Sequence, residues 1–393
     1  MKLLEYPKKI GFIYSFLLLI YIVNPFNAGL YIGYLIPPLV WLHKEFIVKS
    51  LNPTLIFLFL FSIFYAIFFS FEAVSGKQYI VLYAIIPPAF YLLGKLISER
   101  LNNKPTRIYY LLLVIALLVS STSLLSVLKG IQELGFGSID RNLPNFWTGA
   151  IISATLMGAY FSLNMCIPAI LLAKQKKSSL FKIVLAITYV ITLVCVLKIG
   201  SRTQLGVSMI TLFITILYLF PKQSLKRNIT LILIFIGIVI YASTKIDLSL
   251  DGELLSAFAD RSKGGTKELA SGGGRTEKWG KALINIYKKP LGWGVEEFGH
   301  SHNFWLDALR VGGILSFFPL VFFTVRALLI VRGALKKNKK AIGLNVIILV
   351  FTTAFFMIFM AEPILEGLFS YFAVFCLFIG IVDQYRTHQP SKK

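Results

Sequence analysis

The chain has 393 residues, of which 56% are hydrophobic and 15% are charged, and its formal net charge at pH 7 is +22. A mean hydropathy of +0.75 is too high for a soluble globular protein and is typical of proteins that cross a bilayer several times. A charge of this size could indicate a nucleic-acid-binding protein, but the lysines and arginines stand in short clusters between apolar runs. The composition therefore excludes a soluble enzyme and argues against nucleic acid as a partner.

Apolar runs recur along the whole chain. A helix that crosses the bilayer needs about 20 mostly apolar residues. Twelve stretches are candidate spans, of which the first two are short, and they cover residues 10–23, 29–42, 52–71, 79–97, 108–128, 147–173, 183–200, 203–220, 228–243, 303–331, 341–361 and 367–382. The sequence therefore predicts an all-α polytopic membrane protein, with about 12 transmembrane helices in one integral membrane domain over residues 1–393.

The basic residues predict the orientation of these spans, because loops rich in Lys and Arg stay in the cytoplasm. Lys and Arg gather in every second connection and at both ends of the chain. This pattern places both termini in the cytoplasm. The connections expected on the opposite face are residues 72–78, 129–146, 201–203, 244–302 and 362–366.

The longest of these connections, residues 244–302 between the ninth and tenth spans, holds nine Lys or Arg and eight Asp or Glu residues. A long loop of this kind is translocated largely regardless of its charge. Within it, Trp279, Leu283 and Ile286 recur at helical spacing, with lysines between them. This pattern predicts an amphipathic helix lying on the membrane surface.

Two arginines on the outer side are candidates for binding an anion. A guanidinium group matches phosphate oxygens with two parallel hydrogen bonds, so Arg202 and Arg275 together could hold a diphosphate. Arg202 lies in a link of a few residues between two spans, where a charge is costly and tends to be functional. The alternatives are that Arg202 snorkels at a helix end and that Arg275 is an ordinary solvated surface residue.

His302 is the candidate base. An unperturbed imidazole has a pKa of about 6.5, so it can accept a proton near neutral pH. The helix expected to start near Asn303 has the positive end of its dipole there, which favours the neutral form of His302. The alternative is that Asn303 caps the helix and His302 is an ordinary interfacial polar residue. His300 is the second candidate.

The outer segments contain no His-x-x-x-His, Cys-x-x-Cys or phosphate-binding-loop motif. The three cysteines, Cys166, Cys195 and Cys376, lie inside apolar runs and lack the spacing of metal ligands. We therefore expect no metal and no cofactor, and we expect a substrate that is already attached to a lipid.

Five polar fragments, taken together, resemble motifs of the O-antigen ligase and O-antigen polymerase superfamily, bacterial membrane glycosyltransferases that act on undecaprenyl-diphosphate-linked glycans. The fragments are residues 140–145, Gly200-Ser201-Arg202, Gly274-Arg275 with Trp279, residues 290–294, and His302-Asn303 through Leu306 to Gly312-Gly313. Their order and spacing make the resemblance more specific than any one fragment. The first five spans contribute only hydropathy to it.

The resemblance implies a GT-C-like membrane fold and metal-independent transfer with inversion at the sugar carbon. It places the catalytic loop, residues 244–302, on the periplasmic side of the bacterial inner membrane. In this family two arginines are thought to engage the lipid diphosphate, while the His before Asn activates the acceptor hydroxyl. These roles map onto Arg202, Arg275 and His302, and the residues expected to contact substrate are Arg141, Asn145, Trp279, His300 and Asn303.

The implied donor is an undecaprenyl-diphosphate-linked glycan in the membrane lipid, with other polysaccharide-assembly proteins as further partners. The acceptor is a lipid-linked repeat unit for a polymerase or the lipid A core for a ligase, and a related branch glycosylates protein. The 59-residue loop is compact for a ligase, which favours a polymerase. The alternative is a multi-span transporter or flippase. A carrier should have polar residues at mid-span, whereas these spans consist almost entirely of Leu, Ile, Val and Phe.

Overall fold

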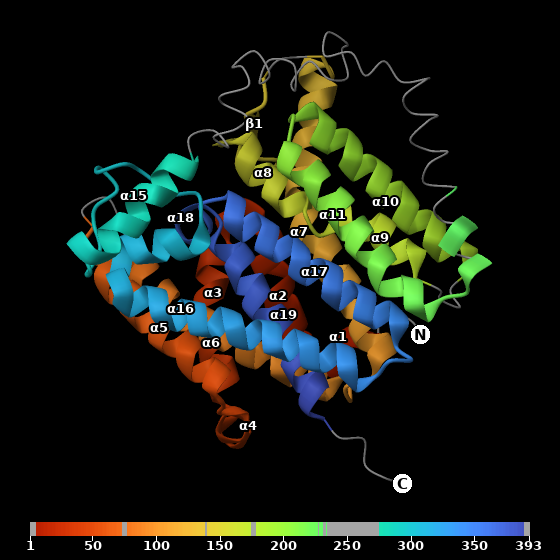
Figure 1. Cartoon of the computed structure of the whole chain (residues 1–393), viewed down its shortest axis with the longest axis horizontal. Helices are drawn as coiled ribbons and strands as arrows, with labels where there is room; N and C mark the ends of the chain where they lie inside the picture. Colours follow the sequence, from red (N-terminus) through yellow and green to blue (C-terminus); the bar gives the residue numbers. More distant parts are fainter. Residues whose placement is uncertain are drawn as a thin grey trace. The chain divides into compact units, whose positions relative to one another are not determined.

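A computed structural model of the chain describes residues 5–72, 77–137, 140–173, 178–226, 228–230, 233 and 275–388, and Figure 1 labels its helices. The chain divides into two compact units. The first unit comprises Met1–Leu118, Ser271–Lys340 and Phe359–Lys393, and the second comprises Val119–Ala270 and Ala341–Ile358.

Within the described residues, six helices are long and apolar enough to cross a membrane, and the number rises to eight if each of two bent helix pairs is one span. The six are α6 (Lys77–Arg100), α7 (Pro105–Leu134), α10 (Ser179–Lys198), α11 (Arg202–Leu219), α16 (Phe304–Lys337) and α17 (Ile342–Ala361). The prediction of an all-α, multi-pass membrane protein is confirmed. The number of twelve spans and the GT-C-like arrangement stay predictions, and the candidate span at 228–243 lies almost entirely outside the described residues.

The first unit begins with short helices. After α1 (Glu5–Ile10), α2 (Phe12–Val23) and α3 (Gly29–Trp41) have 12 and 13 residues, fewer than the roughly 20 that a straight span needs. A short 3₁₀ turn, η1 (Pro25–Asn27), separates them. The next pair, α4 (Lys44–Ser50) and α5 (Pro53–Phe69), is bent by 104°. Asn52 and Pro53 explain where α5 starts, because the Asn52 side chain accepts the Leu55 N–H at 2.9 Å and proline suits the first turn of a helix.

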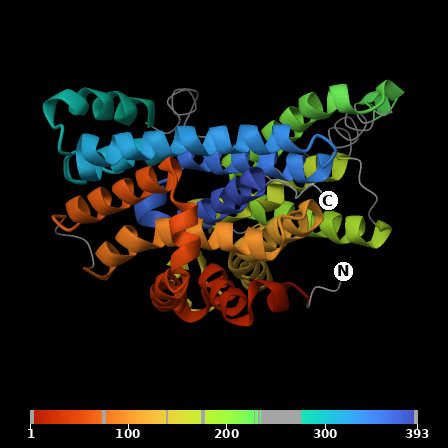
Figure 2. The ribbon, with the colours of Figure 1, turned by 90° about the horizontal axis from the view of Figure 1, so that it is seen from below.

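Two long helix pairs form the core of the first unit: α19 (Phe369–Thr387) packs against α6, and α16 packs against α5. Glycines allow the first pair to approach closely. A Cβ atom at Gly94 would collide with the backbone of Leu377, and a Cβ atom at Gly380 would collide with the backbone of Tyr91. Figure 2 shows α15 (Arg275–Lys288) lying along the N-terminal part of α16.

A buried polar cluster around Asp383 also joins these helices. The Asp383 carboxylate accepts hydrogen bonds from Tyr91 at 2.6 Å, Asn52 at 3.1 Å and Arg386 at 2.8 Å, and it pairs with Lys95 at 3.4 Å. The apolar pattern of the spans did not predict this cluster. Its members come from the start of α5, the second half of α6 and the C-terminal part of α19, so the cluster joins these three helices.

The second unit contains the end of α7, a two-stranded hairpin and a group of helices. In the hairpin, β1 (Leu143–Pro144) pairs antiparallel with β2 (Ile151–Ile152). The candidate span at 147–173 is a broken pair, in which α8 (Ala154–Phe161) is bent by 45° from η2 (Asn164–Cys166) and α9 (Ile167–Leu172). The described part of the unit also contains α10, α11, η3 (Phe220–Lys222) and most of α17. All three cysteines of the chain are buried and free.

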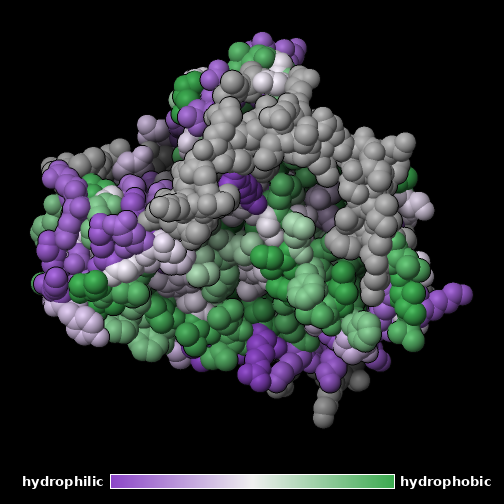
Figure 3. Space-filling model, turned by 45° about the horizontal axis from the view of Figure 1, so that its top comes forward, coloured by the Kyte–Doolittle hydropathy of each residue, from purple (hydrophilic) through white to green (hydrophobic). Residues whose placement is uncertain are grey.

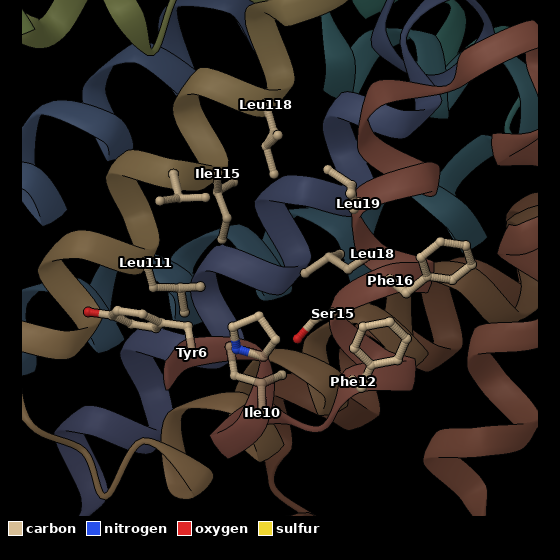
Figure 4. Close-up of a pocket in the computed structure, with 12 residues that line it drawn as sticks. Tyr6, Ile10, Phe12, Ser15, Phe16, Leu18, Leu19, Leu111, Ile115 and Leu118 are labelled. Carbon is tan, nitrogen blue, oxygen red and sulfur yellow. The ribbon is translucent and has the colours of Figure 1, made fainter. Parts of the chain in front are cut away.

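The first unit also has an apolar groove of about 280 Å³ between its N-terminal helices and α7. Figure 4 shows Leu111 and Ile115 of α7 on one side of the groove and Leu18 and Leu19 of α2 on the other. None of the residues that line it is charged. The groove therefore offers a surface for apolar chains but no group for acid or base chemistry.

Candidate active site

The candidate site is built on the segment that enters α16, where Asn303 caps the helix. Its side-chain oxygen accepts the backbone N–H groups of Trp305 and Leu306, each at 3.2 Å. The buried carboxylate of Asp307 reaches back and accepts the N–H groups of Ser301 at 2.7 Å and Asn303 at 3.3 Å. Because these two N–H groups flank His302, Asp307 fixes the backbone on both sides of the candidate base.

His302 is held in a conformation that few residues adopt. Its φ angle is +53°, in the left-handed region that disfavours side chains with a Cβ atom, and histidine is one of the residues found there. The side chain is half-buried, and its Nδ1 atom has no hydrogen-bond partner in the part of the chain that the structure describes. The bonds from Asp307 and the cap at Asn303 offset the cost of this backbone conformation.

The electrostatic environment of His302 keeps its imidazole neutral. Burial, and then the positive charges of Arg275 and Lys278, lower the pKa of His302 from 6.5 to about 4. Neutrality was expected from the sequence, but through the dipole of the following helix. The structure gives burial and then two cations of α15 as the causes.

The amphipathic helix α15 holds the His loop from the other side. The indole N–H of Trp279 donates to the Ser301 carbonyl at 2.9 Å, and the Lys278 ammonium donates to the His300 carbonyl at 3.2 Å. The same face of α15 packs Trp279 and Ile286 against a small core of Ala282, Trp293, Leu306 and Leu309. Two of the residues named from the sequence, Arg275 and Trp279, thus lie on the helix that contacts the His loop.

The other face of α15 is exposed and mixed in character. Leu283, Ile284 and Tyr287 are more than half exposed, and Lys281 forms an exposed pair with Glu277 at 2.7 Å. Figure 3 shows hydrophilic residues gathered on the left, where α15 lies, next to hydrophobic helix surface. Exposed apolar side chains beside lysines are what a helix at a bilayer surface presents.

The turn at residues 290–294 interlocks with a kink in α16. Gly312 and Gly313 leave the helical conformation, and the φ of Gly313 is +53°. The Trp293 N–H donates to the Arg310 carbonyl, and the Ile314 N–H donates to the Pro290 carbonyl, both at 2.8 Å. A Cβ atom at Gly313 would collide with the Pro290 carbonyl oxygen. The two glycine motifs are therefore two sides of one backbone contact, and this contact fixes the turn next to the start of α16.

A buried arginine, which the sequence analysis did not single out, lies beneath the His loop. Arg310 is fully buried, and its two terminal nitrogens contact Glu72 at 2.5 Å and Glu366 of α18 (Ile364–Gly367). The Nδ1 atom of His300 lies 3.7 Å from Glu366. Burial raises the pKa of Glu72 above its usual value, although Arg310 opposes this. The sequence did contain a signal, because Glu72 and Glu366 both fall in segments expected on the same outer face as His302.

Arg202 lies in the second unit, at the first position of α11. The link that precedes it contains only residues 199–201, and Gly200 turns it with a φ of +61°. Arg141 lies against this link, since its Nε atom donates to the Ile199 carbonyl at 2.9 Å. Lys198, a lysine at the end of an apolar run that the sequence analysis passed over, is buried and donates to the carbonyls of Gly135 and Phe136 at 3.1 Å each.

The Asn145 side chain stabilises the turn between β1 and β2. Its side-chain oxygen accepts the N–H groups of Trp147 at 2.8 Å and Thr148 at 3.2 Å, which is an Asx turn. Its backbone N–H donates to the Ala150 carbonyl at 2.7 Å. The hairpin that carries Asn145 therefore follows directly after the segment that carries Arg141.

The candidate residues thus form two groups, each described within its own unit. Arg275, Trp279, His300, His302 and Asn303 come together around the start of α16, and Arg141, Asn145 and Arg202 belong to the second unit. Of the predicted loop 244–302, residues 244–274 lie outside the described residues. Among the residues that are described, no group of three His, Cys, Asp or Glu side chains is arranged to hold a metal ion.

A scan against protein-family models and a search of the curated proteins each found no match for this chain. The resemblance therefore rests on the sequence fragments alone.

Proposed function

We propose that the chain is a membrane glycosyltransferase of the O-antigen ligase and polymerase type. It transfers an undecaprenyl-diphosphate-linked oligosaccharide or polysaccharide to a hydroxyl acceptor on the periplasmic side of the bacterial inner membrane. The observation that carries the proposal is His302, a neutral imidazole held in a strained backbone conformation at the start of α16, beside Arg275 and Lys278. Buried groups with a strongly shifted pKa and a constrained backbone concentrate at functional sites.

The proposed reaction is a single displacement. A ring nitrogen of His302 takes the proton from the acceptor hydroxyl as its oxygen forms a bond to the anomeric carbon of the donor. The bond between that carbon and the diphosphate oxygen breaks, and the electron pair leaves with undecaprenyl diphosphate. The resemblance gives Arg202 and Arg275 the role of binding the diphosphate in the donor and in the leaving group. Attack from the face opposite the leaving group inverts the anomeric centre.

The cations near the two helix starts support the diphosphate role. Arg275 and Lys278 act on His302 through their charge. Arg141 donates to the link that leads to Arg202, and Lys198, which directly precedes this link, donates to the carbonyls of Gly135 and Phe136. A diphosphate bound near Arg275 would also raise the affinity of His302 for a proton, because it would offset the positive charges that lower its pKa. The base would then become stronger when the donor is bound.

The polymerase and ligase alternatives share this chemistry and differ in the acceptor. In a deletion strain of the host, loss of long chains with single repeat units still attached to the core would indicate a polymerase. Long chains stranded on undecaprenyl lipid would indicate a ligase. Unchanged surface glycan would argue for the transporter or flippase alternative.

The direct test is His302→Ala in a purified assay with lipid-linked donor and acceptor. General-base catalysis is worth about 100-fold to 10,000-fold, so we expect transfer near background from a folded, membrane-inserted protein. His300→Ala is the matched control, because His300 is two residues away and contacts Glu366. Wild-type turnover of His302→Ala, or loss of transfer when a chelator is added, would contradict the assignment of a metal-independent base mechanism.

A further inference from the structure

A second cavity of the first unit, of about 300 Å³, opens beside Arg310 and the turn at residues 290–294. It combines aromatic rings with carboxylates and an open stretch of backbone. The residues that matter here are Phe68, Phe71, Trp293, Glu72, Glu296 and Gly294. Its volume is at the small end of the roughly 300 to 1,000 Å³ typical of ligand sites, so it suits one ring and not an extended chain.

The aromatic side chains of this cavity are placed for contact with a ligand. Phe71 is 77% exposed, and its ring lies edge-on to that of Phe68 with the centroids 6.4 Å apart. Trp293 is buried. Its backbone N–H donates to the Arg310 carbonyl, and its ring packs against that of Phe298 with the centroids 5.5 Å apart. Its indole N–H has no hydrogen-bond partner within the described ranges of the chain.

The carboxylates give the cavity its polar character. Glu72 is held by the buried guanidinium of Arg310 at 2.5 Å, so its position is fixed. Glu296, on the turn itself, is exposed. Ionised carboxylates only accept hydrogen bonds, so they select ligands rich in O–H or N–H donors. An anionic ligand would face the carboxylates of Glu72 and Glu296, and the described residues that line the cavity include no lysine or arginine.

We propose that this cavity is a binding subsite for one neutral or amino-substituted pyranose ring of the glycan substrate. A pyranose has apolar C–H faces that pack on aromatic rings and a rim of hydroxyl donors that carboxylates accept. The inference rests on the proposed function for the sugar's place in the reaction, while the binding itself is measured separately. The subsite discriminates against uronic acids, whose carboxylate would face Glu72 and Glu296.

A phospholipid acyl chain is a poorer occupant, because it would leave both carboxylates without donors. A quaternary ammonium ligand would also use aromatic rings and a negative charge. A quaternary ammonium ion, however, has no O–H or N–H group to donate to the carboxylates of Glu72 and Glu296. The observations favour a ligand that needs acceptors more than it needs a counter-charge.

The experiment uses the full chain in phospholipid nanodiscs, because the headgroups of maltoside detergents are themselves sugars. Saturation-transfer NMR would measure the binding of methyl glucoside, methyl galactoside, methyl glucosaminide and methyl glucuronide, with tetramethylammonium as a separate ligand. We expect at least one of the neutral or amino glycosides to bind and the glucuronide to bind at least about tenfold more weakly. Equal binding of the glucuronide, tighter binding of tetramethylammonium, or no binding of any glycoside would overturn the proposal.

Two pairs of variants test whether the glycosides bind in this cavity. Phe71→Ala should weaken the best glycoside about threefold to tenfold, as expected for loss of one ring contact. Tyr287→Ala is its control, because Tyr287 is 89% exposed in the same unit but does not line the cavity. Glu296→Gln should raise the relative affinity for the glucuronide, whereas Glu277→Gln, an exposed carboxylate of α15, should not. Equal effects of the paired variants would contradict this location.

The two proposals fail separately. If glycosides bind and respond to Phe71→Ala but no lipid-linked donor supports transfer, the subsite stands and the transferase function is wrong. If transfer depends on His302 while Phe71→Ala and Glu296→Gln leave glycoside binding unchanged, the function stands and the subsite is wrong.

Discussion

The basic side chains in the polar regions of the two units have different kinds of partner. In the first unit, Arg310 is buried between two carboxylates, Glu72 and Glu366, so its positive charge is neutralised within the protein. In the second unit, Arg141 and Lys198 contact neutral carbonyl oxygens, although the exposed Asp140 also acts on Lys198 through its charge. Carbonyl oxygens orient a cation without neutralising it. The first arrangement therefore ties an arginine to two acidic segments, and the second ties Arg141 and Lys198 to backbone carbonyls of their own unit.

The comparison predicts, as its largest effect, that Arg310→Met destabilises the protein. The substitution leaves Glu72 and Glu366 close together without their cation, and loss of one partner of a buried ion pair costs about 3 to 5 kcal/mol. Unfolding of the full chain in mixed micelles, followed by tryptophan fluorescence, would measure the change in the free energy of unfolding.

A triple variant provides the control for Arg310. Replacing Arg310 by Met together with Glu72→Gln and Glu366→Gln removes all three charges, so it should recover much of the lost stability. If Arg310→Met is as stable as the wild type but inactive, Arg310 acts on substrate and the contrast between the two regions is wrong.

The second prediction concerns Arg202, where the expected loss is in activity and not in stability. Arg202→Lys keeps the charge but not the two-pronged guanidinium, so the bonds to a diphosphate would weaken by about 1.5 to 3 kcal/mol, or roughly tenfold to a hundredfold in transfer. The assay is transfer from lipid-linked donor, with the amount of folded protein measured alongside. Normal long-chain glycan from both Arg202→Lys and Arg275→Lys would remove the diphosphate role.

Sequence reasoning reached some features of these regions and missed others for physical reasons. The start of α16 could be predicted because Asn303 is a local cap before an apolar run. The helix α15 could be predicted because Trp279, Leu283 and Ile286 recur at helical spacing, although Leu283 lies on the exposed face. The role of Arg310 could not, because its partners come from segments 238 and 56 residues away in the chain. Local patterns carry no information about such pairings.

The same limit explains two further misses. Lys198 and Asp383 looked like isolated charges at the ends of apolar runs, and only packing shows that each meets several oxygens or donors from other elements. The glycine pairs at residues 292–294 and 312–313 were visible as motifs, but their sequence does not show that they contact each other. Close backbone approach is a tertiary property, although glycine is the residue that permits it.

The third prediction tests that contact through Gly292, whose φ is +104°. A Cβ atom there would lie 2.5 Å from the Arg310 carbonyl oxygen, so Gly292→Ala must both strain the backbone and open the contact with α16. We expect a loss of about 1 to 3 kcal/mol in stability. Gly280→Ala is the matched control, because a Cβ atom at Gly280 meets nothing within 4 Å and helix propensity favours alanine there. An equal effect of the two variants would show that the turn does not depend on this close approach.

The smallest expected effect is that of moderate acidity on His302, and it separates the mechanism from an ordinary histidine. The base must be neutral, and its pKa in the free protein is lowered to about 4, so the active form persists above that value and is lost only as the pH falls through it. Between pH 8 and pH 5.5, kcat/KM should therefore fall by only a few per cent, whereas a base with a pKa near 6.5 would lose about tenfold. The substitution Lys278→Gln should move the acidic limb of the pH profile to higher pH, because it removes one of the positive charges that disfavour protonation of His302. Lys281→Gln, on the exposed side of α15 and paired with Glu277, should leave the limb in place. A limb near pH 6.5 in the wild-type profile, or one that does not respond to Lys278→Gln, would mean that His302 is not the group that takes the proton.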